Sequence, residues 1–241
     1  MNTLTPQAVL FEDNHLLVMN KPAGLLTQPV PDDNRDSLEE IGKRYLKEAY
    51  NKPGRVFLHA VHRIDRQVSG LVIFARTDKA LARLNRTIRD KQMTKIYHAL
   101  VEGRPGPPGK TTCLKNYLSH RSHHALVTNG KAADSREALL AYTVIASHDA
   151  TSLVQIDLDT GRYHQIRAQL AHAGHPVVGD RKYGSTRPFG PQDAIGLHSY
   201  NARFFHPVRK EELDIIAPYP AVWEELFPDL LSRLDERWNR G

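Results

Sequence analysis

The residue best suited to chemistry in this sequence is an aspartate that stands between two arginines. Asp65 lies in the polar segment His62–Gly70, between two short apolar runs, with Arg63 and Arg66 beside it. A nearby guanidinium favours the charged form of a carboxylate, so we expect Asp65 to be ionised at neutral pH. An ionised carboxylate on a loop between rigid strands can act as a nucleophile or as a general base. The same residues also fit an ordinary surface salt bridge, and their types alone leave both interpretations open.

A second group of polar side chains surrounds the predicted start of a helix. The segment Thr160–Arg167 contains four hydrogen-bond donors, which are Arg162, His164, Gln165 and Arg167. A helix N-terminus with such donors suits a phosphate or a carboxylate. His164 and Arg167 are three residues apart and share a helix face, and an economical arrangement pairs Arg167 with the aspartate described above. The alternative is a capped amphipathic helix whose polar face is solvated.

The charge pattern is compatible with a polyanionic partner. The 241 residues include 33 Lys and Arg against 27 Asp and Glu, a net charge of +6, and the sequence pI is near 9.4. Basic residues concentrate in segments 76–104 and 161–187, whereas the segment from residue 211 to the end is acidic. One basic segment alone fits a solvated surface equally well, but two together favour contact with a phosphate backbone.

Composition excludes several other classes of protein. Hydrophobic residues make up 40% of the chain and charged residues 25%, which is typical of a globular protein. The single cysteine, Cys113, excludes an intramolecular disulfide framework and a cysteine-rich zinc site. No apolar run approaches the roughly 18 residues of a membrane span, and Met1–Leu10 lacks the pattern of a signal peptide. We therefore expect a soluble cytoplasmic protein with no membrane partner.

Two apparent ligand motifs fail on their spacing. The Gly-Lys-Thr run at 109–111 lacks the phosphate-loop glycine five residues earlier, because position 104 holds Arg. His59 and His62, with Asp65, imitate a site of two histidines and one carboxylate. A spacing of three at a strand end, however, directs the two histidines to different faces. We therefore expect no nucleotide cofactor and no metal.

Hydrophobic periodicity and turn residues predict a chain of mixed strands and helices. The expected strands are Ala8–Phe11, His15–Met19, Val56–Val61, Leu71–Ala75, Lys95–Val101, Leu139–Ala146, Leu153–Leu158 and Ala202–Phe205. The expected helices are one capped by Ser37 with Glu40 at the capping-box position, Asp78–Lys91 with Asp78 as its cap, His164–Ala173 before a C-terminal Gly174, and one beginning near Ala221. Because these elements show no regular strand–helix–strand repetition, we expect the α+β class.

The two polar segments resemble the motifs of a known family. His62–Gly70 resembles the H-R-L-D-x-x-T-S-G signature of the RluA-type RNA pseudouridine synthases, of the RluA/RsuA superfamily, and Thr160–Arg167 resembles their G-R-x-H-Q-I-R segment. Weaker blocks in the same order are Asn20–Leu25, Lys95–Ala99, Gly179–Gly184, Leu197–His198 and Phe205–Pro207. The departures are Ile64 for Leu, Gln67-Val68 for a pair such as Pro-Thr, and Ser199 for Ala. They bear on substrate preference more than on activity.

The resemblance implies both a fold and a reaction. The fold is a central mixed, mostly antiparallel sheet flanked by helices and loops, with the active-site cleft across the sheet. The reaction is the isomerisation of specific uridines in rRNA or tRNA to pseudouridine, and it uses a catalytic aspartate and no cofactor. The bond from the base nitrogen to the ribose breaks, the base turns, and a carbon–carbon bond forms without a redox step. The target base must first leave its stack, which costs a few kcal/mol.

The resemblance also implies roles for individual residues. Asp65 takes the position of the catalytic aspartate, and Arg167 that of the arginine that pairs with it. Tyr97 takes the position of the tyrosine that lies over the uracil and is the expected proton acceptor. Arg63 would help to occupy the space that the flipped nucleotide leaves. The other expected RNA-binding residues are Arg66, Arg83, Lys95, Arg162, His164, Gln165 and Arg181.

The domain organisation is expected to be simple. We expect one catalytic domain over residues 1–241, with the motifs in about 18–207 and the acidic segment of about 208–241 packed on it. Many family members carry an N-terminal S4 RNA-binding domain, for which the chain before Asn20 has no room. We therefore expect the catalytic domain to recognise an RNA stem-loop by itself, as a monomer. Two other functions stay open, which are RNA binding without catalysis and metal-assisted hydrolysis with His59, His62 and Asp65.

Overall fold

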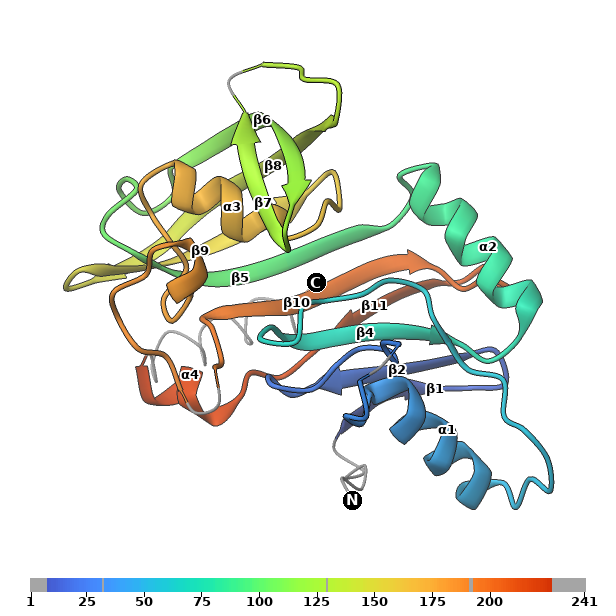
Figure 1. The fold of residues 1–241 in the computed structure, drawn as a ribbon. Helices are drawn as coiled ribbons and strands as arrows, with labels where there is room; N and C mark the ends of the chain where they lie inside the picture. Colours follow the sequence, from blue (N-terminus) through green and yellow to red (C-terminus); the bar gives the residue numbers. More distant parts are fainter. Residues whose placement is uncertain (1–7, 32, 129, 191–192, 227–241) are drawn as a thin grey trace.

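The strands form one mixed sheet in the computed structural model, which describes residues 8–31, 33–128, 130–190 and 193–226 (Figure 1). In these residues the strand order is β1-β2-β4-β10-β5-β9-β8-β6-β7, with β3 paired to β4 and β11 to β10. The strands are β1 (Val9–Glu12), β2 (Leu16–Lys21), β3 (His59–Ala60), β4 (Ser69–Ala75), β5 (Thr94–Glu102), β6 (Thr111–Arg121), β7 (His124–Thr128), β8 (Ser135–His148), β9 (Thr151–Leu158), β10 (Leu197–Phe205) and β11 (Glu212–Ile216). Among the strands of the described residues, only the pairing of β4 with β10 is parallel. The α+β class and the mostly antiparallel sheet are thus confirmed.

Strand β2 shows how the sequence builds a core on both faces of this sheet. Successive side chains of a strand point to opposite faces. Leu17 and Met19 accordingly join one hydrophobic cluster, whereas Leu16 and Val18 join another. Because all four are fully buried, this end of the sheet must be covered on both sides.

Two helices provide that cover, and their N-termini follow the expected chemistry. Helix α1 (Leu38–Ala49) packs on the cluster of Leu17, and helix α2 (Asp78–Arg89) on the cluster of Leu16. The Ser37 hydroxyl accepts a hydrogen bond from the Glu40 amide, which confirms the predicted cap. The predicted cap of α2 was wrong by one residue, because the Thr77 hydroxyl accepts from the Ala80 amide.

Two further helices cover the other half of the sheet. Helix α3 (Gln165–His172) packs Ile166 and Leu170 into the same cluster as α1. Helix α4 (Ala221–Leu226) buries Trp223 completely in a separate cluster that includes Tyr200. Helix α4 is thus packed on the sheet, while residues 227–241 of the acidic segment lie outside the described residues, so the packing of that segment stays a prediction.

Several strands differ from the sequence-based expectation. The apolar run 56–61 forms ladder pairs only at His59–Ala60, although its Leu58 is fully buried. Strands β6, β7 and β11 were not predicted. Strand β6 alternates exposed and half-buried residues along most of its length, so its sequence is polar and its apolar pattern is weak. The apolar periodicity of a sequence reflects which side chains are buried and not which backbones pair. Because these strands bury few side chains, their sequences give little sign of a strand.

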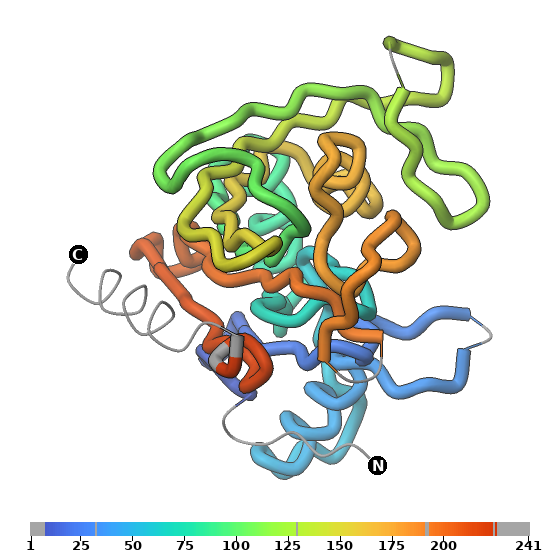
Figure 2. Tube along the Cα trace, turned by 90° about the vertical axis from the view of Figure 1, so that its left-hand side faces the viewer, coloured from blue at the N-terminus to red at the C-terminus, as the bar shows by residue number. Residues whose placement is uncertain are grey.

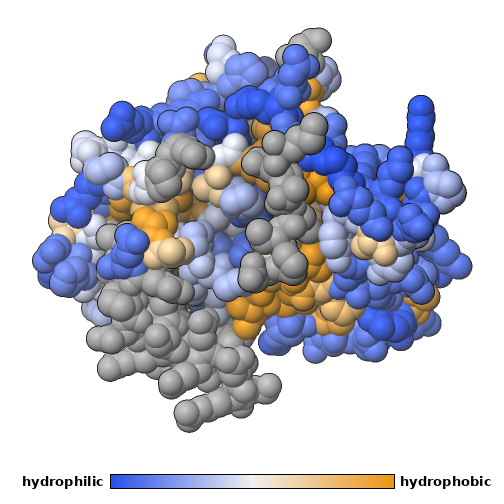
Figure 3. Space-filling model, turned by 90° about the horizontal axis from the view of Figure 1, so that it is seen from below, coloured by the Kyte–Doolittle hydropathy of each residue, from blue (hydrophilic) through white to orange (hydrophobic). Residues whose placement is uncertain are grey.

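The face seen from below is mostly hydrophilic, with apolar residues exposed in a few central patches (Figure 3). Among the described residues, no helix has both the length and the apolar character needed to cross a membrane.

Candidate active site

The loop that carries Asp65 is held from beneath by the segment after β2. The Thr27 hydroxyl donates to the Ile64 carbonyl at 2.8 Å, and the Gly24 amide donates to the Arg66 carbonyl at 2.7 Å. The buried ammonium of Lys21 donates to the carbonyls of Pro22, Leu25 and Arg66. Burial lowers the pKa of Lys21 to about 7. These contacts fix the backbone on both sides of Asp65 while leaving its side chain free to face the cleft.

The Asp65 carboxylate is bound by an arginine from α3. Arg167 Nη1 donates to Asp65 Oδ2 at 2.9 Å, and the same guanidinium makes two further bonds to Asp180, at 2.6 and 2.8 Å. Arg167 and Asp180 are 2% and 0% exposed, whereas the Asp65 side chain is 26% exposed. Burial alone would lower the pKa of Arg167, but the two carboxylates raise it. The arginine is therefore a fixed cation between one buried carboxylate and one accessible carboxylate.

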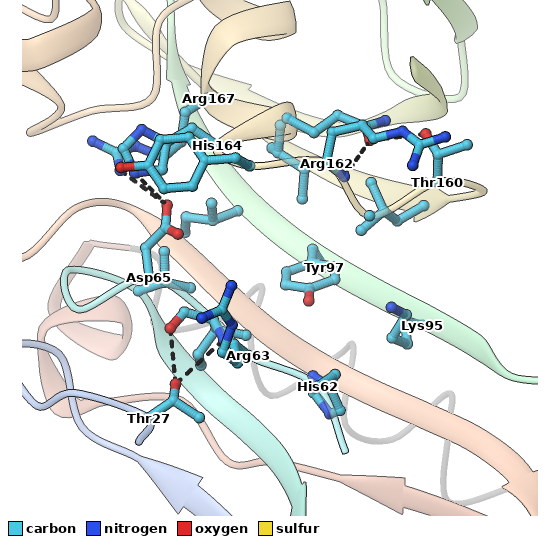
Figure 4. Close-up of a pocket in the computed structure, with 18 of the residues that line it drawn as sticks. Thr27, His62, Arg63, Asp65, Lys95, Tyr97, Thr160, Arg162, His164 and Arg167 are labelled. Carbon is cyan, nitrogen blue, oxygen red and sulfur yellow. Dashed lines mark hydrogen bonds and ion pairs between the residues drawn. The ribbon is translucent and has the colours of Figure 1, made fainter. Parts of the chain in front are cut away.

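His164 is the second contact of the Asp65 carboxylate. Its Nε2 lies 3.4 Å from Asp65 Oδ2. Burial, with Arg167 nearby, lowers the pKa of His164 to about 3, so the ring is neutral at pH 7. The Tyr183 hydroxyl accepts from the Ala125 amide and lies within hydrogen-bond distance of His164 Nδ1, at 3.0 Å. Figure 4 shows Asp65 pointing to both Arg167 and His164.

Tyr97 and Lys95, from β5, lie across the cavity from this cluster (Figure 4). Burial raises the pKa of the Tyr97 phenol to about 12, although a hydrogen bond from Ser199 acts in the opposite direction. The phenol is therefore protonated in the free protein at neutral pH, and it accepts a proton only if it passes its own on. Burial also lowers the pKa of Lys95.

These side chains line one large open cavity of about 1170 Å³. Nine Lys and Arg residues line it against four Asp residues. The cations are Arg35, Arg63, Arg66, Arg89, Lys91, Lys95, Arg162, Arg167 and Lys182. A cavity lined by more cationic than anionic side chains attracts a polyanion. The Asp65 carboxylate, held by Arg167, supplies one nucleophile or base at the wall of this cavity.

The described residues offer no obvious place for a metal ion. Within them, no three His, Cys, Asp or Glu side chains are grouped as metal ligands would be. His59 lies 4.0 Å from Glu39, and His62 accepts from the Ile73 amide. The two histidines of the metal hypothesis therefore face different partners.

Comparisons with known proteins agree with this geometry. The family model described as RNA pseudouridylate synthase matches residues 15–172. Ribosomal large subunit pseudouridine synthase D of Zymomonas mobilis is 31% identical, over 94% of this chain and 73% of the relative. Ribosomal large subunit pseudouridine synthase C of Vibrio vulnificus is 33% identical, over 92% of this chain and 69% of the relative.

The chain belongs to the RNA pseudouridylate synthase family. It is thus an isomerase that converts uridine to pseudouridine in RNA, and the predicted likeness to the RluA-type enzymes is confirmed. The fold agrees as well. A solved structure titled Human RNA Pseudouridylate Synthase Domain Containing 4 has a TM-score of 0.74 at 20% identity, covering 95% of this chain and 93% of that one.

The structure brings most of the predicted site residues of this pseudouridine synthase to one cavity, but not all. Arg63, Arg66, Lys95, Arg162 and His164 line it together with Asp65, Tyr97 and Arg167. Arg83 and Arg181 lie outside its lining, and Arg83 donates instead to the Pro207 carbonyl.

Gln165 lies in the cavity wall but uses its side chain within the protein. Its Oε1 accepts from the Thr160 hydroxyl and the Arg162 amide, and its Nε2 donates to the Leu139 carbonyl. The side chain is buried. Gln165 therefore holds the loop before α3, and its contact with RNA stays a prediction.

Sequence reasoning missed two residues of the synthase site. Asp180 makes the bidentate contact with Arg167, and Ser199 bonds the phenol of Tyr97. Both stand in blocks that carry the family resemblance, Asp180 in Gly179–Gly184 and Ser199 after Leu197–His198. Their place in those blocks indicated that they belong to the site, but the sequence spacing did not predict which residues they contact.

Proposed function

We propose that this pseudouridine synthase modifies a uridine of large-subunit ribosomal RNA, presented in a stem-loop, and that it acts as a monomer in the cytoplasm. The names of the synthase C and D relatives support the choice of RNA. The excess of cations around the cavity supports a phosphate-rich ligand. The observation that carries the catalytic assignment is the accessible carboxylate of Asp65 beside the buried Arg167.

In this proposal Asp65 acts at the ribose carbon of the flipped uridine. Arg167 keeps the carboxylate ionised and oriented. The bond from ribose to N1 breaks, the uracil turns, and the bond from ribose to C5 forms. The proton on C5 leaves to Tyr97, which passes a proton on, and N1 regains one, so that nothing external is consumed. Arg63 fills the space that the base leaves in its stack, which offsets part of the cost of flipping.

The remaining cations hold the RNA backbone in this proposal. Arg66, Lys95 and Arg162 line the cavity at different points, and Arg83 and Arg181 extend the basic surface beyond it. Contacts of this kind position an RNA without reading its sequence. The choice of uridine then depends on the shape of the loop and on the fit of the base in the cavity.

The test is tritium release from RNA labelled at C5 of uracil. Unmodified transcripts of large-subunit rRNA, small-subunit rRNA and tRNA are each incubated with the wild type, Asp65→Asn and Tyr97→Phe. We expect release from large-subunit rRNA by the wild type only. Both variants should bind that RNA within about threefold of the wild type, because phosphate contacts supply most of the affinity.

Each other outcome rejects a stated part of the proposal. Tritium release only from tRNA would reject large-subunit rRNA as the substrate but would leave the proposed catalytic reaction in place. Release by Asp65→Asn would reject the catalytic assignment. Release from no RNA by the wild type, with binding intact, would favour RNA binding without catalysis.

A further inference from the structure

A column of stacked rings runs from the proposed catalytic carboxylate to the protein surface. His164 is its first ring, 3.4 Å from Asp65 through Nε2. The Tyr163 ring stacks on His164 with centroids 3.9 Å apart and planes inclined by 16°. His120, from β6, lies against Tyr163 at 4.4 Å but is inclined by 50°. The two inner rings are thus parallel, while the outermost ring is tilted.

The inner rings are fixed before any ligand arrives. The Tyr163 hydroxyl donates to the His123 carbonyl at 3.3 Å, which ties the ring to the turn between β6 and β7. The Tyr183 hydroxyl holds His164 from the other side. A platform whose rings are already oriented loses little conformational entropy when a ligand stacks on it.

Tyr163 is nevertheless accessible. Its side chain is 41% exposed, it lines the same cavity as Asp65, and the histidine against its outer face is itself exposed. A ring tilted by 50° covers only part of that face, and an exposed side chain can rotate away. Tyr163 would also be found here if it served only to pack the β6–β7 hairpin on α3. Loss of RNA affinity on its removal distinguishes ligand binding from such packing.

The surroundings of Tyr163 select one kind of ligand. Arg162 and Lys182 line the same cavity as Tyr163, and the Arg167 guanidinium acts on its phenol electrostatically, so this exposed ring belongs to a cavity rich in cations. The hairpin β6–β7 and the segments 28–31 and 33–36 project on the same side of the molecule (Figure 2), and all contribute to the cavity. A planar group on an anionic chain fits between them, because bases stack on aromatic rings while cations hold phosphates.

We propose that the outer face of Tyr163 binds an unpaired nucleobase of the substrate RNA, adjacent to the uridine that reacts. This inference rests on the proposed function. Only the ring of His164 separates Tyr163 from Asp65, with 3.4 Å from the carboxylate to His164 Nε2 and 3.9 Å between the centroids of the two rings. The bound base displaces His120 and continues the column. Position 163 is the one that the G-R-x-H-Q-I-R pattern leaves open, so this contact contributes to the choice of substrate by this chain.

The experiment uses a stem-loop RNA with one loop uridine that the wild type modifies. 2-Aminopurine, whose fluorescence is quenched by stacking, replaces the nucleotide on either side of that uridine, giving two probes. Binding is measured with Asp65→Asn as the background, so that the RNA is not turned over. We expect one probe to be quenched on binding and the quenching to disappear in Tyr163→Ala.

Affinity and turnover give the quantitative readout. Tyr163→Ala should weaken binding about tenfold, within the range of about 5- to 150-fold that loss of one stacked base produces. When Asp65 is present and turnover is measured, Tyr163→Ala should raise KM more than it lowers kcat. Tyr163→Phe should stay within about twofold of the wild type, because the ring is kept. Tyr50→Ala is the matched control, since Tyr50 is 50% exposed and lies outside the cavity lining.

Failure of this inference and failure of the proposed function give different results. If the wild type modifies the RNA but Tyr163→Ala binds and reacts like the wild type, with quenching unchanged, Tyr163 binds no base. If Tyr163→Phe is as weak as Tyr163→Ala, the hydroxyl contact with the hairpin matters and stacking does not. If the wild type modifies none of the RNAs, the proposed function fails first.

Discussion

At the scale of single residues, the site depends on a guanidinium shared by two carboxylates. Asp180 is fully buried and binds Arg167 through two bonds, while Asp65 accepts one bond and stays accessible. The buried carboxylate therefore orients the arginine, and the arginine orients the accessible carboxylate. Asp180 is a positioning residue that acts through Arg167.

We expect Asp180→Asn to lower kcat for pseudouridine formation at least tenfold and to change KM less than threefold. The loss of one partner from a buried charge pair also costs about 3–5 kcal/mol of stability. Steady-state kinetics and urea unfolding measure the two effects. The control is Asp193→Asn, which removes the exposed ion pair with Arg66 and should cost less than about 1 kcal/mol. Equal kcat in Asp180→Asn and the wild type would show that Asp65 needs no such support.

Sequence reasoning reached part of this site. The pairing of Arg167 with Asp65 was predicted because one polar segment contains an ionised carboxylate and the other contains cationic hydrogen-bond donors. Asp180 was out of reach because its role depends on how the segment after α3 turns back beneath the guanidinium. The role of Tyr97 came only from the family resemblance, since a tyrosine in an apolar strand does not by itself indicate chemistry.

At the scale of elements, local signals were predictable and distant pairings were not. The cap of α1 depends on Ser37 and Glu40, three residues apart, and was predicted correctly. Strand β11 could not be predicted, because Ile215 is the one buried residue of Glu212–Ile216 and the strand is ordered by pairing with β10. The run 56–61 was predicted as a strand from its apolar residues, yet Leu58 is buried without a ladder pair.

Gly70 lies where the loop that carries Asp65 enters strand β4, so a substitution there measures how tightly the sheet constrains that loop. It adopts a φ of +111°, and a Cβ there would lie 2.3 Å from the Ser199 carbonyl oxygen. We expect Gly70→Ala to destabilise the protein by about 3 kcal/mol or more, because both the backbone conformation and the contact are unfavourable. It should also reduce activity in the protein that remains folded.

Thermal unfolding and turnover per folded molecule measure these effects. Gly54→Ala serves as the control, since nothing lies within 4 Å of a Cβ at that position, and it should change stability by less than about 1 kcal/mol. A Gly70→Ala protein as stable as the wild type would mean that β4 and β10 can move apart without cost.

At the scale of the whole molecule, four buried or half-buried histidines make the fold sensitive to acid. Burial lowers the pKa of His62, His98 and His164 to about 3 and that of His198 to about 4. In the unfolded chain a histidine binds its proton near pH 6.5. Between these values the unfolded state binds more protons, so the free energy of unfolding falls as the pH falls from about 6.5 to about 4.

We expect the urea midpoint to be clearly lower at pH 5.0 than at pH 7.5. The loss is on the order of 1 kcal/mol per pH unit for each of the most buried histidines. His148→Asn is the control, because His148 is 74% exposed and should not alter the pH dependence. Equal midpoints at the two pH values would contradict the assignment of neutral buried rings.

The single parallel pairing has a consequence for the time at which the enzyme becomes active. Ser69, in β4, contacts His198, in β10, across 129 positions of the chain. At about 5–20 residues per second, the ribosome makes β10 roughly 6–26 s after β4. Through that interval β4, whose residues are all buried in the finished protein, lacks its central neighbour. The loop that carries Asp65 therefore lacks this support until β10 has been made, and we expect a growing chain to modify no RNA before that strand has emerged from the ribosome.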